Sequence, residues 1–443
     1  MKYQAYTLHS WQLMPQYELI SSELRKEIEL TAMVLPFKTN NYVVNELIDW
    51  SNFENDPIFN LNFPRKEMLQ PAHYAQLVKA DEEKWNSLQM KELIQSILHQ
   101  LNPNPSGQSH NVPYFNGVFL NGVQHKYKQT VLFFPSQGQT CHAYCTFCFR
   151  WPQFVGMSEL KFAMKESELL VAYLKEHKEV TDVLFTGGDP MTMSAKVLRT
   201  YIEPLLGVGL EHIQTIRIGT KSLAYWPYRY LSDNDTPELI RLFEQIVLKG
   251  INLSFMAHFN HPAELSTPAV ESAIMRLRSL GCQIRTQSPL LKHINDKPEL
   301  WAEMWRRQVN LNCIPYYMFV ERDTGAKSYF ELPLETCWNI FREAYQRVSG
   351  VCRTVRGPSM SANAGKIQIL GVCEVAGEKV FVLRFLQGRG AHWVAQPFFA
   401  KYDASATWFD QLKPAFGQSQ FFFEEELKQL ISHDDWVVDD DLE

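Results

Sequence analysis

The hydrophobic pattern divides the chain into three regions. Residues 1–110 are mostly helical in pattern, and the segment 71–101 repeats apolar residues at helical spacing. The stretch 102–107, with two prolines and a glycine, breaks this pattern. From residue 371 onward the periodic signal fades. We therefore expect a mainly helical N-terminal region at 1–110, a central domain at 111–370 and a C-terminal extension at 371–443.

In the central domain, short β-rich runs alternate with amphipathic segments. The expected strands are 130–135, 183–186, 215–219, 252–257, 283–287 and 313–320. Two of the helices between them have clear end signals: Thr236 and Thr267 open them before a proline, and Gly250 and Gly281 close them. Strand–helix alternation predicts a parallel sheet. Six units in succession favour an α/β fold, a partial (β/α)6 TIM-like barrel, over an open doubly wound sheet.

A polar or glycine-rich cluster follows each expected strand. In order, these clusters are 141–148, 187–190, 219–221, 258–262, 287–288 and 321–323. The C-terminal ends of parallel barrel strands converge on the active site. We therefore expect the six clusters to form one common site.

Composition and charge narrow the possible classes of protein. The 443 residues are 45% hydrophobic and 21% charged, which suits a sizeable core. A net charge of −6 gives no basic footprint, so no nucleic-acid partner is expected. The N-terminus lacks signal-peptide features, and no apolar run approaches the roughly 20 residues that span a bilayer. Eight cysteines, three of them clustered, fit a reducing compartment. We expect a cytoplasmic protein without a membrane partner.

The cluster after the first expected strand has an informative cysteine spacing. Cys141, Cys145 and Cys148 form a Cys-x3-Cys-x2-Cys loop. Such a loop can ligate three irons of a [4Fe-4S] cluster and leave the fourth iron open. A structural zinc site would normally add a fourth Cys or His, and His142 is badly placed inside the loop. Two alternative interpretations are a zinc knuckle and three unrelated thiols.

With Phe147 directly before the third cysteine, the loop resembles the motif of the radical S-adenosylmethionine (SAM) superfamily. The resemblance implies a [4Fe-4S] cluster that reduces SAM and releases a 5′-deoxyadenosyl radical. After the next expected strand, Gly187, Gly188 and Asp189 suit the methionine part of SAM. Two glycines permit close backbone approach, and a carboxylate can accept a hydrogen bond from the SAM ammonium group.

Further segments narrow the resemblance to one family. Segments 34–42, 182–190, 258–262, 295–296 and 315–317 together resemble the lysine 2,3-aminomutase family, and the similarity runs from about residue 34 to residue 370. That family also uses pyridoxal 5′-phosphate (PLP) and moves an amino group between adjacent carbons of an amino acid. The resemblance implies an isomerase with an amino acid substrate. It also implies an electron donor such as flavodoxin or ferredoxin, and we expect a homo-oligomer.

The resemblance assigns the PLP site to two stretches. The family's PLP lysine follows a glycine-rich turn, and the matching stretch 356–367 makes Lys366 the expected catalytic lysine, which forms the resting Schiff base. Most of the family's glycines are replaced there by Ser, Ala and Asn. Thr130 stands where relatives carry an arginine for the PLP phosphate. Lys126, Tyr127 or Lys128 is expected to compensate.

Three other positions match the family. Arg150 matches the arginine that holds the α-carboxylate of the substrate, a bidentate task suited to a guanidinium. His258 and Gln287 match positions near SAM. The resemblance therefore implies that substrate and SAM lie at these strand ends.

Two positions depart from the family in the sign of their charge. Lysine-specific relatives present two aspartates to the distal ammonium of the substrate, and Arg322 and Arg356 occupy those positions here. Two guanidinium groups would repel an ammonium but clamp a carboxylate. We therefore expect a 2,3-aminomutase for an acidic substrate, glutamate or aspartate. A shift of one residue would instead place Asp323 at the first position.

Other functions stay open at this point. The chain could be a lysine 2,3-aminomutase, another radical SAM enzyme of the family without PLP, or a zinc-binding scaffold protein. Some family members bind a structural zinc through a C-terminal cysteine cluster, but only Cys373 lies beyond residue 352, so no zinc is expected. We expect the remaining cysteines to be buried packing residues: Cys282, Cys313, Cys337 and Cys352.

Overall fold

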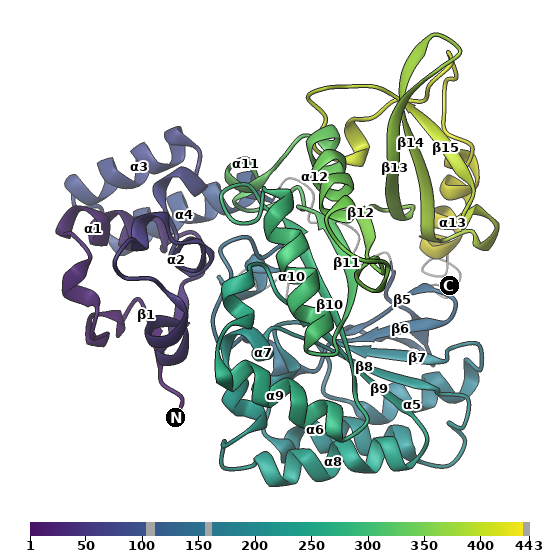
Figure 1. Cartoon of the computed structure of the whole chain (residues 1–443), viewed down its shortest axis with the longest axis horizontal. Coiled ribbons are helices and arrows are strands. Elements are labelled where there is room, and N and C mark those ends of the chain that lie inside the picture. Colours follow the sequence, from purple (N-terminus) through teal and green to yellow (C-terminus); the bar gives the residue numbers. More distant parts are fainter. Residues whose placement is uncertain (103–110, 156–161, 437–443) are drawn as a thin grey trace.

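A mixed sheet forms the centre of the computed structural model, which describes residues 1–102, 111–155 and 162–436 (Figure 1). Within these residues the sheet has eleven strands, in the order β15-β14-β13-β12-β11-β10-β9-β8-β7-β6-β5. Six consecutive parallel strands overlap the six expected ones: β6 (Thr130–Phe133), β7 (Asp182–Phe185), β8 (Thr215–Thr220), β9 (Asn252–His258), β10 (Gln283–Leu290) and β11 (Ile314–Val320). At one edge β5 (Val123–Tyr127) pairs antiparallel with β6. The α/β fold with its open, partial barrel is confirmed.

The helices between the parallel strands cover the outside of the barrel (Figure 1). They are α5 (Ser167–Glu176), α6 (Ala195–Ile202), α8 (Thr236–Leu248), α9 (Pro268–Ser279), α10 (Pro298–Asn310) and α12 (Leu334–Gln346). Two short helices, α7 (Ser222–Tyr225) and α11 (Lys327–Phe330), lie in the loops after β8 and β11. The predicted ends of α8 and α9 are confirmed, except that the N-cap residue of α8 is Asp235 rather than Thr236. Thr267 caps α9 by accepting a hydrogen bond from the Val270 amide at 3.3 Å. Gly250 and Gly281 follow their helices with φ of +79° and +86°, a conformation that favours glycine.

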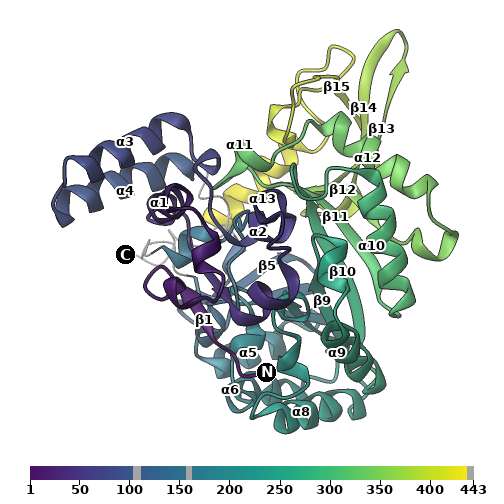
Figure 2. The same ribbon diagram turned by 60° about the vertical axis from the view of Figure 1, so that its left-hand side comes forward.

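The N-terminal region packs beside the barrel in both ribbon views (Figures 1 and 2). It contains a two-stranded sheet, β1 (Ala5–Thr7) and β2 (Lys38–Asn40), and helices α1 (Ser22–Thr31), α2 (Pro57–Asn62), α3 (Pro71–Glu82) and α4 (Ser87–Leu101). The helical pattern predicted for 71–101 is confirmed and is divided between α3 and α4. Most of the predicted boundary stretch 102–107 lies outside the described residues.

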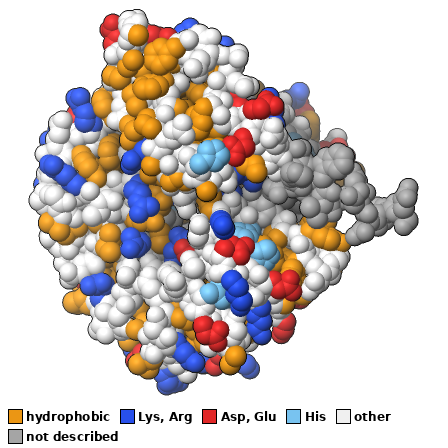
Figure 3. Space-filling model, turned by 90° about the vertical axis from the view of Figure 1, so that its right-hand side faces the viewer, with side chains coloured by type: hydrophobic (Ala, Val, Ile, Leu, Met, Phe, Trp, Pro, Cys, Tyr) orange, Lys and Arg blue, Asp and Glu red, His pale blue; other side chains and the backbone are white. Residues whose placement is uncertain are grey.

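The C-terminal part of the sheet differs from the sequence-based expectation. β12 (Arg356–Ser361) continues the parallel strands, and β13 (Gly365–Val375), β14 (Glu378–Gly388) and β15 (Pro397–Lys401) follow it antiparallel. The stretch 356–367 is therefore mostly strand rather than a turn, and the boundary expected at residue 370 falls inside β13. Residues 365–436, which we call the C-terminal unit, extend the central sheet and end in α13 (Glu424–Trp436). The space-filling view shows hydrophobic side chains over the upper part of one face, with charges of both signs below (Figure 3).

Two clusters of buried side chains hold these parts together. One joins the N-terminal region to the barrel, and the other joins β11–β15 to α10 and α12. The four cysteines expected in the core are buried: Cys282, Cys313, Cys337 and Cys352. Among the described residues, no helix has the length and apolar character that a membrane crossing requires.

Candidate active site

Hydrogen bonds connect the loops that follow β7, β8 and β9. The Asp189 carboxylate accepts from Thr220 Oγ1 at 2.7 Å and from the Lys221 amide at 2.9 Å. Lys221 Nζ donates to Asn260 Oδ1 at 2.8 Å and to Glu264 Oε1 at 2.7 Å. The loops therefore meet at the C-terminal edge of the sheet. Sequence reasoning placed 219–221 in the site without a role for Lys221 and missed Glu264, whose place beside the 258–262 cluster was the available signal.

The glycine pair after β7 lets the cysteine loop pack against this edge. A Cβ added to Gly188 would lie 2.5 Å from both the amide nitrogen and the carbonyl oxygen of Thr140, and one added to Gly187 would collide with the Gln139 side chain. The Asp189 amide donates to the Thr140 carbonyl at 2.6 Å. The two glycines were expected to let the backbone approach SAM closely. In the structure the cysteine loop already packs so closely on them that no side chain would fit.

Residues of the N-terminal region hold the cysteine loop from outside. Tyr3 Oη donates to the His142 carbonyl at 2.7 Å, and the Tyr144 amide donates to the Lys38 carbonyl at 2.8 Å. Sequence reasoning did not connect these residues to the site, although Lys38 lies in segment 34–42, which carried part of the family resemblance. The N-terminal region therefore supports the loop as well as the fold.

The three thiols of the cysteine loop have raised pKa values. Burial raises the pKa of Cys145 to about 12 and of Cys148 to about 11, and the pKa of Cys141 is raised by burial, by the Asp189 carboxylate and by the other two cysteines. Bound iron would stabilise such thiolates. Among the described residues, no three His, Cys, Asp or Glu side chains converge closely enough to hold one metal ion. A cubane cluster binds each thiolate through a different iron and does not need that convergence.

Lys366 lies on β13, opposite Ser361 of β12. Its Nζ is 4.0 Å from the centre of the Tyr317 ring. Burial lowers the pKa of Lys366 to about 8, and the positive charges of Arg217 and Arg356 contribute. A desolvated amine near other cations is a good nucleophile for a carbonyl carbon. Lys366 therefore fits the PLP aldehyde, and as expected it follows a turn, which here leads directly into β13.

Lys126 reaches the same space from β5, at the other edge of the open barrel. Its Nζ donates to the Ala362 carbonyl at 2.7 Å and so connects β5 with the turn between β12 and β13. Burial lowers the pKa of Lys126 to about 7, as do the charges of Arg389, Arg322 and Lys366. This concentration of positive charge fits a phosphate group.

The region around Thr130 contains an arginine from another strand. Thr130 pairs in register with Asp182 of β7, and the Asp182 carboxylate is 2.8 Å from an Arg217 guanidinium nitrogen. Arg217, on β8, was not singled out from the sequence. Tyr127, expected near PLP, has its pKa raised by burial and by Tyr317. An arginine is therefore near Lys366 even though position 130 is a threonine.

The guanidinium groups of Arg150 and Arg322 both lie near the ring of Phe149. Their guanidinium carbons lie 5.4 and 5.3 Å from the centre of the Phe149 ring. Burial lowers the pKa of Arg150 to about 10, and the charge of Arg322 adds to this effect. Nη1 of Arg150 and Nε of Arg322 are buried without a hydrogen-bond partner. The two arginines therefore offer donors that an anionic ligand could satisfy.

Arg356 does not join this pair. It is exposed at the start of β12, and its Nη1 lies 3.4 Å from Tyr316 Oη and 3.5 Å from Tyr317 Oη. Arg322 Nη1 instead donates to the Ser361 carbonyl, at the opposite end of β12, at 3.2 Å. Arg322 and Arg356 thus contact groups at opposite ends of β12, and the clamp expected of the two stays a prediction.

Of the residues expected near SAM, His258 ends β9 and Gln287 lies within β10. His258 of β9 and Gln287 of β10 are partners in register. Nε2 of His258 is buried without a partner, and the His258 ring centre is 5.6 Å from that of Phe147 in the cysteine loop. Burial and the charge of Lys221 keep the pKa of His258 far below its ordinary value. A neutral imidazole beside the loop fits SAM. The Asp189 carboxylate accepts hydrogen bonds from protein donors, and the role expected for it toward SAM stays a prediction.

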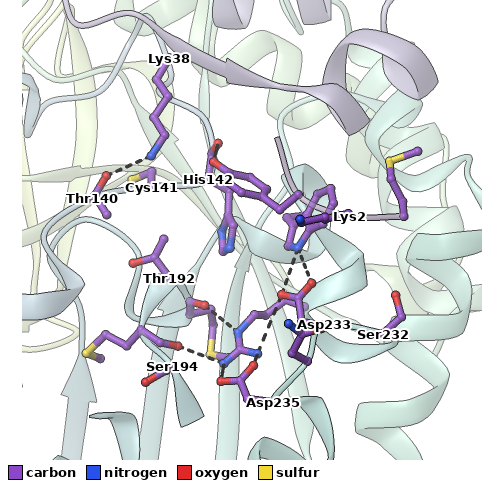
Figure 4. A pocket seen from close by; sticks show the side chains of 17 residues that line it. Lys2, Lys38, Thr140, Cys141, His142, Thr192, Ser194, Ser232, Asp233 and Asp235 are labelled. Carbon is purple, nitrogen blue, oxygen red and sulfur yellow. Dashed lines mark hydrogen bonds and ion pairs between the residues drawn. The ribbon is translucent and has the colours of Figure 1, made fainter. Parts of the chain in front are cut away.

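A cavity of about 710 Å³ lies behind the cysteine loop (Figure 4). Its lining includes Lys2, Lys38, Cys141, His142 and Asp233, and the His142 ring points into it. Of the residues expected in the site, Cys141 alone lines this cavity. The cavity is thus a space separate from the residues proposed for PLP and substrate.

The fold and the cysteine loop together define a class. A partial parallel barrel whose first parallel strand leads into a Cys-x3-Cys-x2-Cys loop is the arrangement of radical SAM enzymes. Among solved structures, the chain resembles a radical SAM methyltransferase from Sphaerobacter thermophilus, with 15% identity, a TM-score of 0.37, and coverage of 53% of this chain and 68% of that one. It also resembles SuiB from Streptococcus suis, with 12% identity, a TM-score of 0.35, and coverage of 61% and 56%.

Sequence relatives define the family. The chain is 31% identical over 394 residues to an Aquifex aeolicus protein that is named, provisionally, an L-lysine 2,3-aminomutase; the match covers 89% of this chain and 92% of that protein. It is 26% identical over 266 residues to the L-lysine 2,3-aminomutase of Clostridium subterminale, covering 60% of each. No family model matches. The chain belongs to the lysine 2,3-aminomutase family, which confirms the resemblance noted in the sequence.

Proposed function

We propose that this protein is a radical SAM, PLP-dependent aminomutase that converts an α-amino acid into a β-amino acid. The observation that carries the proposal is the position of Lys366. Its amine, with a pKa lowered to about 8, shares one site with Lys126 and Arg322. Arg322 is linked through the Phe149 ring to Arg150 and hence to the cysteine loop. One connected set of contacts thus joins three groups: an amine that could bind PLP, guanidinium donors that could bind a carboxylate, and the cysteine loop that could bind the cluster.

When bound, the cluster with SAM supplies a radical that removes a substrate hydrogen, and PLP supplies a conjugated ring that carries the migrating nitrogen. Lys366 Nζ would hold the PLP aldehyde carbon, and Lys126 would neutralise the phosphate. Arg150 would bind the α-carboxylate through its unpartnered Nη1. The buried surroundings of these groups limit access of water, which protects a radical from side reactions.

The proposed substrate has an acidic side chain, glutamate or aspartate. The guanidinium groups of Arg150 and Arg322 both lie near the Phe149 ring, so one can bind the α-carboxylate and the other the side-chain carboxylate. A distal ammonium at the same place would meet the positive charges of Arg322 and Lys126. Lysine is the second candidate, because relatives that match much of the chain carry its name.

The test is anaerobic turnover of protein reconstituted with iron, sulfide, PLP and SAM, with a one-electron donor such as flavodoxin. Glutamate, aspartate, glutamine and lysine are offered separately, and β-amino products are identified by mass spectrometry. We expect an acidic substrate to have the highest kcat/KM. Lysine as the best substrate would refute the acidic assignment. SAM cleavage without any β-amino acid would refute the aminomutase, and stoichiometric zinc without iron would favour a scaffold protein.

A further inference from the structure

Two aromatic rings from distant parts of the chain hold the Arg322 guanidinium. Its carbon is 5.3 Å from the centre of the Phe149 ring and 5.6 Å from that of the Trp408 ring. Phe149 belongs to the cysteine loop, and Trp408 belongs to the C-terminal unit, beyond the segment that carried the family resemblance. The one hydrogen bond that Arg322 makes to another described residue goes to the Ser361 carbonyl. The direction of its unpartnered Nε therefore depends on this hydrogen bond and on the two rings.

Trp408 is itself firmly placed. Its side chain is buried in the core of the C-terminal unit, and its amide donates to Gln411 Oε1 at 3.1 Å. The next residue, Phe409, packs against Phe421 with ring centres 5.4 Å apart. The Ala406 carbonyl accepts a hydrogen bond of 2.8 Å from the first residue of α12. The indole is thus anchored both to the C-terminal unit and to the barrel.

Acidic residues act on the charge of Arg322, although no ion pair between the described residues includes this side chain. The negative charges of Asp323, Glu321 and Asp410 all raise the pKa of Arg322 against the lowering effect of burial. Of these, Asp410 lies two residues beyond Trp408. A guanidinium that turned toward such a carboxylate would be neutralised within the protein. The face of an aromatic ring attracts a guanidinium without consuming its charge or its N–H donors.

We propose that Trp408 is a positioning residue that keeps Arg322 directed toward the substrate, so that the C-terminal unit determines the charge of the side chain the enzyme accepts. The inference rests on the proposed function, because it assigns Arg322 to a substrate carboxylate. It adds that part of the specificity lies in a segment remote in sequence from both the cysteine loop and Lys366.

The test measures the charge selectivity of binding. Trp408→Leu removes the ring, and Trp408→Phe retains an aromatic face. Trp393→Phe is the matched control, because Trp393 is a fully buried indole of the same core that packs against Phe385 and Phe423. Dissociation constants for glutamate and its neutral isostere glutamine are measured by calorimetry on holoenzyme with cluster and PLP but without SAM. Thermal unfolding of each variant is recorded alongside.

We expect Trp408→Leu to weaken glutamate binding about tenfold and glutamine binding less than about twofold, with Trp408→Phe intermediate and Trp393→Phe unchanged in selectivity. Equal weakening of both ligands, or none, would overturn the inference. If Trp408→Leu does not fold, the ratio measured for Trp408→Phe decides. A wild-type protein that binds glutamine as well as glutamate would refute the proposed acidic specificity itself. If the wild type prefers glutamate and both Trp408 variants keep that preference, the role of Trp408 is refuted and the proposed acidic specificity stands.

Discussion

Adding one methyl group at Gly188 is expected to separate the cysteine loop from the sheet. The Cβ of Gly188→Ala would lie 2.5 Å from the Thr140 amide nitrogen and carbonyl oxygen and 2.8 Å from the Gly138 carbonyl. All three contacts are with backbone, so no side-chain rotation can relieve them. The loop must move outward, and Cys141, the residue after Thr140, moves with it. Gly188 has no positive φ, so the effect is purely steric.

Forcing extra volume into a packed site typically costs about 1–3 kcal/mol. If that strain falls on the loop position that binds the cluster, the affinity for the cluster decreases by about 5- to 150-fold. The measurement is iron and sulfide per chain after anaerobic reconstitution at limiting iron, together with the visible absorbance of the cluster. We expect Gly188→Ala to hold much less iron than the wild type while its circular dichroism is unchanged.

Gly350→Ala is the matched control. A Cβ at Gly350 meets no atom within 4 Å, and Gly350 also has no positive φ. Its iron content should equal that of the wild type. Full iron loading in Gly188→Ala would refute the reasoning, because it would mean that the close packing of the loop on β7 is not needed to bind the cluster.

Three further predictions concern other parts of the site. Lys366→Met should abolish the visible absorbance that PLP gains on binding an amine. In the wild type the rate of PLP uptake should rise with pH and level off above about 8, because only the neutral amine reacts and the pKa of Lys366 is lowered to about 8; a rate still rising at pH 10 would contradict this. Arg322→Gln should weaken glutamate binding about tenfold or more and Arg356→Gln less than about threefold, since the latter guanidinium is exposed; comparable losses would instead support a clamp of Arg322 with Arg356. Asp189→Asn should lower the free energy of unfolding in urea by about 1–3 kcal/mol, because an amide cannot replace both acceptor oxygens toward Thr220 and Lys221; unchanged stability would show that these bonds contribute little.

The parallel barrel could be predicted because its signals are local. Each of the six strands is a short β-rich run, and helices such as α8 and α9 carry their own proline, cap and glycine signals. The C-terminal strands could not be predicted in the same way. The pairing of β13 with β14 shifts register between Lys366 and Ile367 and again between Ile369 and Gly371. Such irregularities interrupt the period of two by which a strand is recognised.

The sequence by itself determined the fold class, the family and the cysteine loop. Three cysteines within eight residues have to share one loop, so their spacing alone is informative. The sequence also made Lys366 the candidate PLP lysine, although it did not predict the strand that carries this residue.

The contacts of the charged side chains could be read from the tertiary structure alone. The family resemblance relates Arg322 to Arg356, but in the structure the groups that they contact lie at opposite ends of β12. Arg150, Phe149 and Trp408, all distant in the chain, surround Arg322 instead. The direction of a long side chain is determined by the groups that pack around it. Here those groups come from loops that are distant in sequence and are brought together only by the fold.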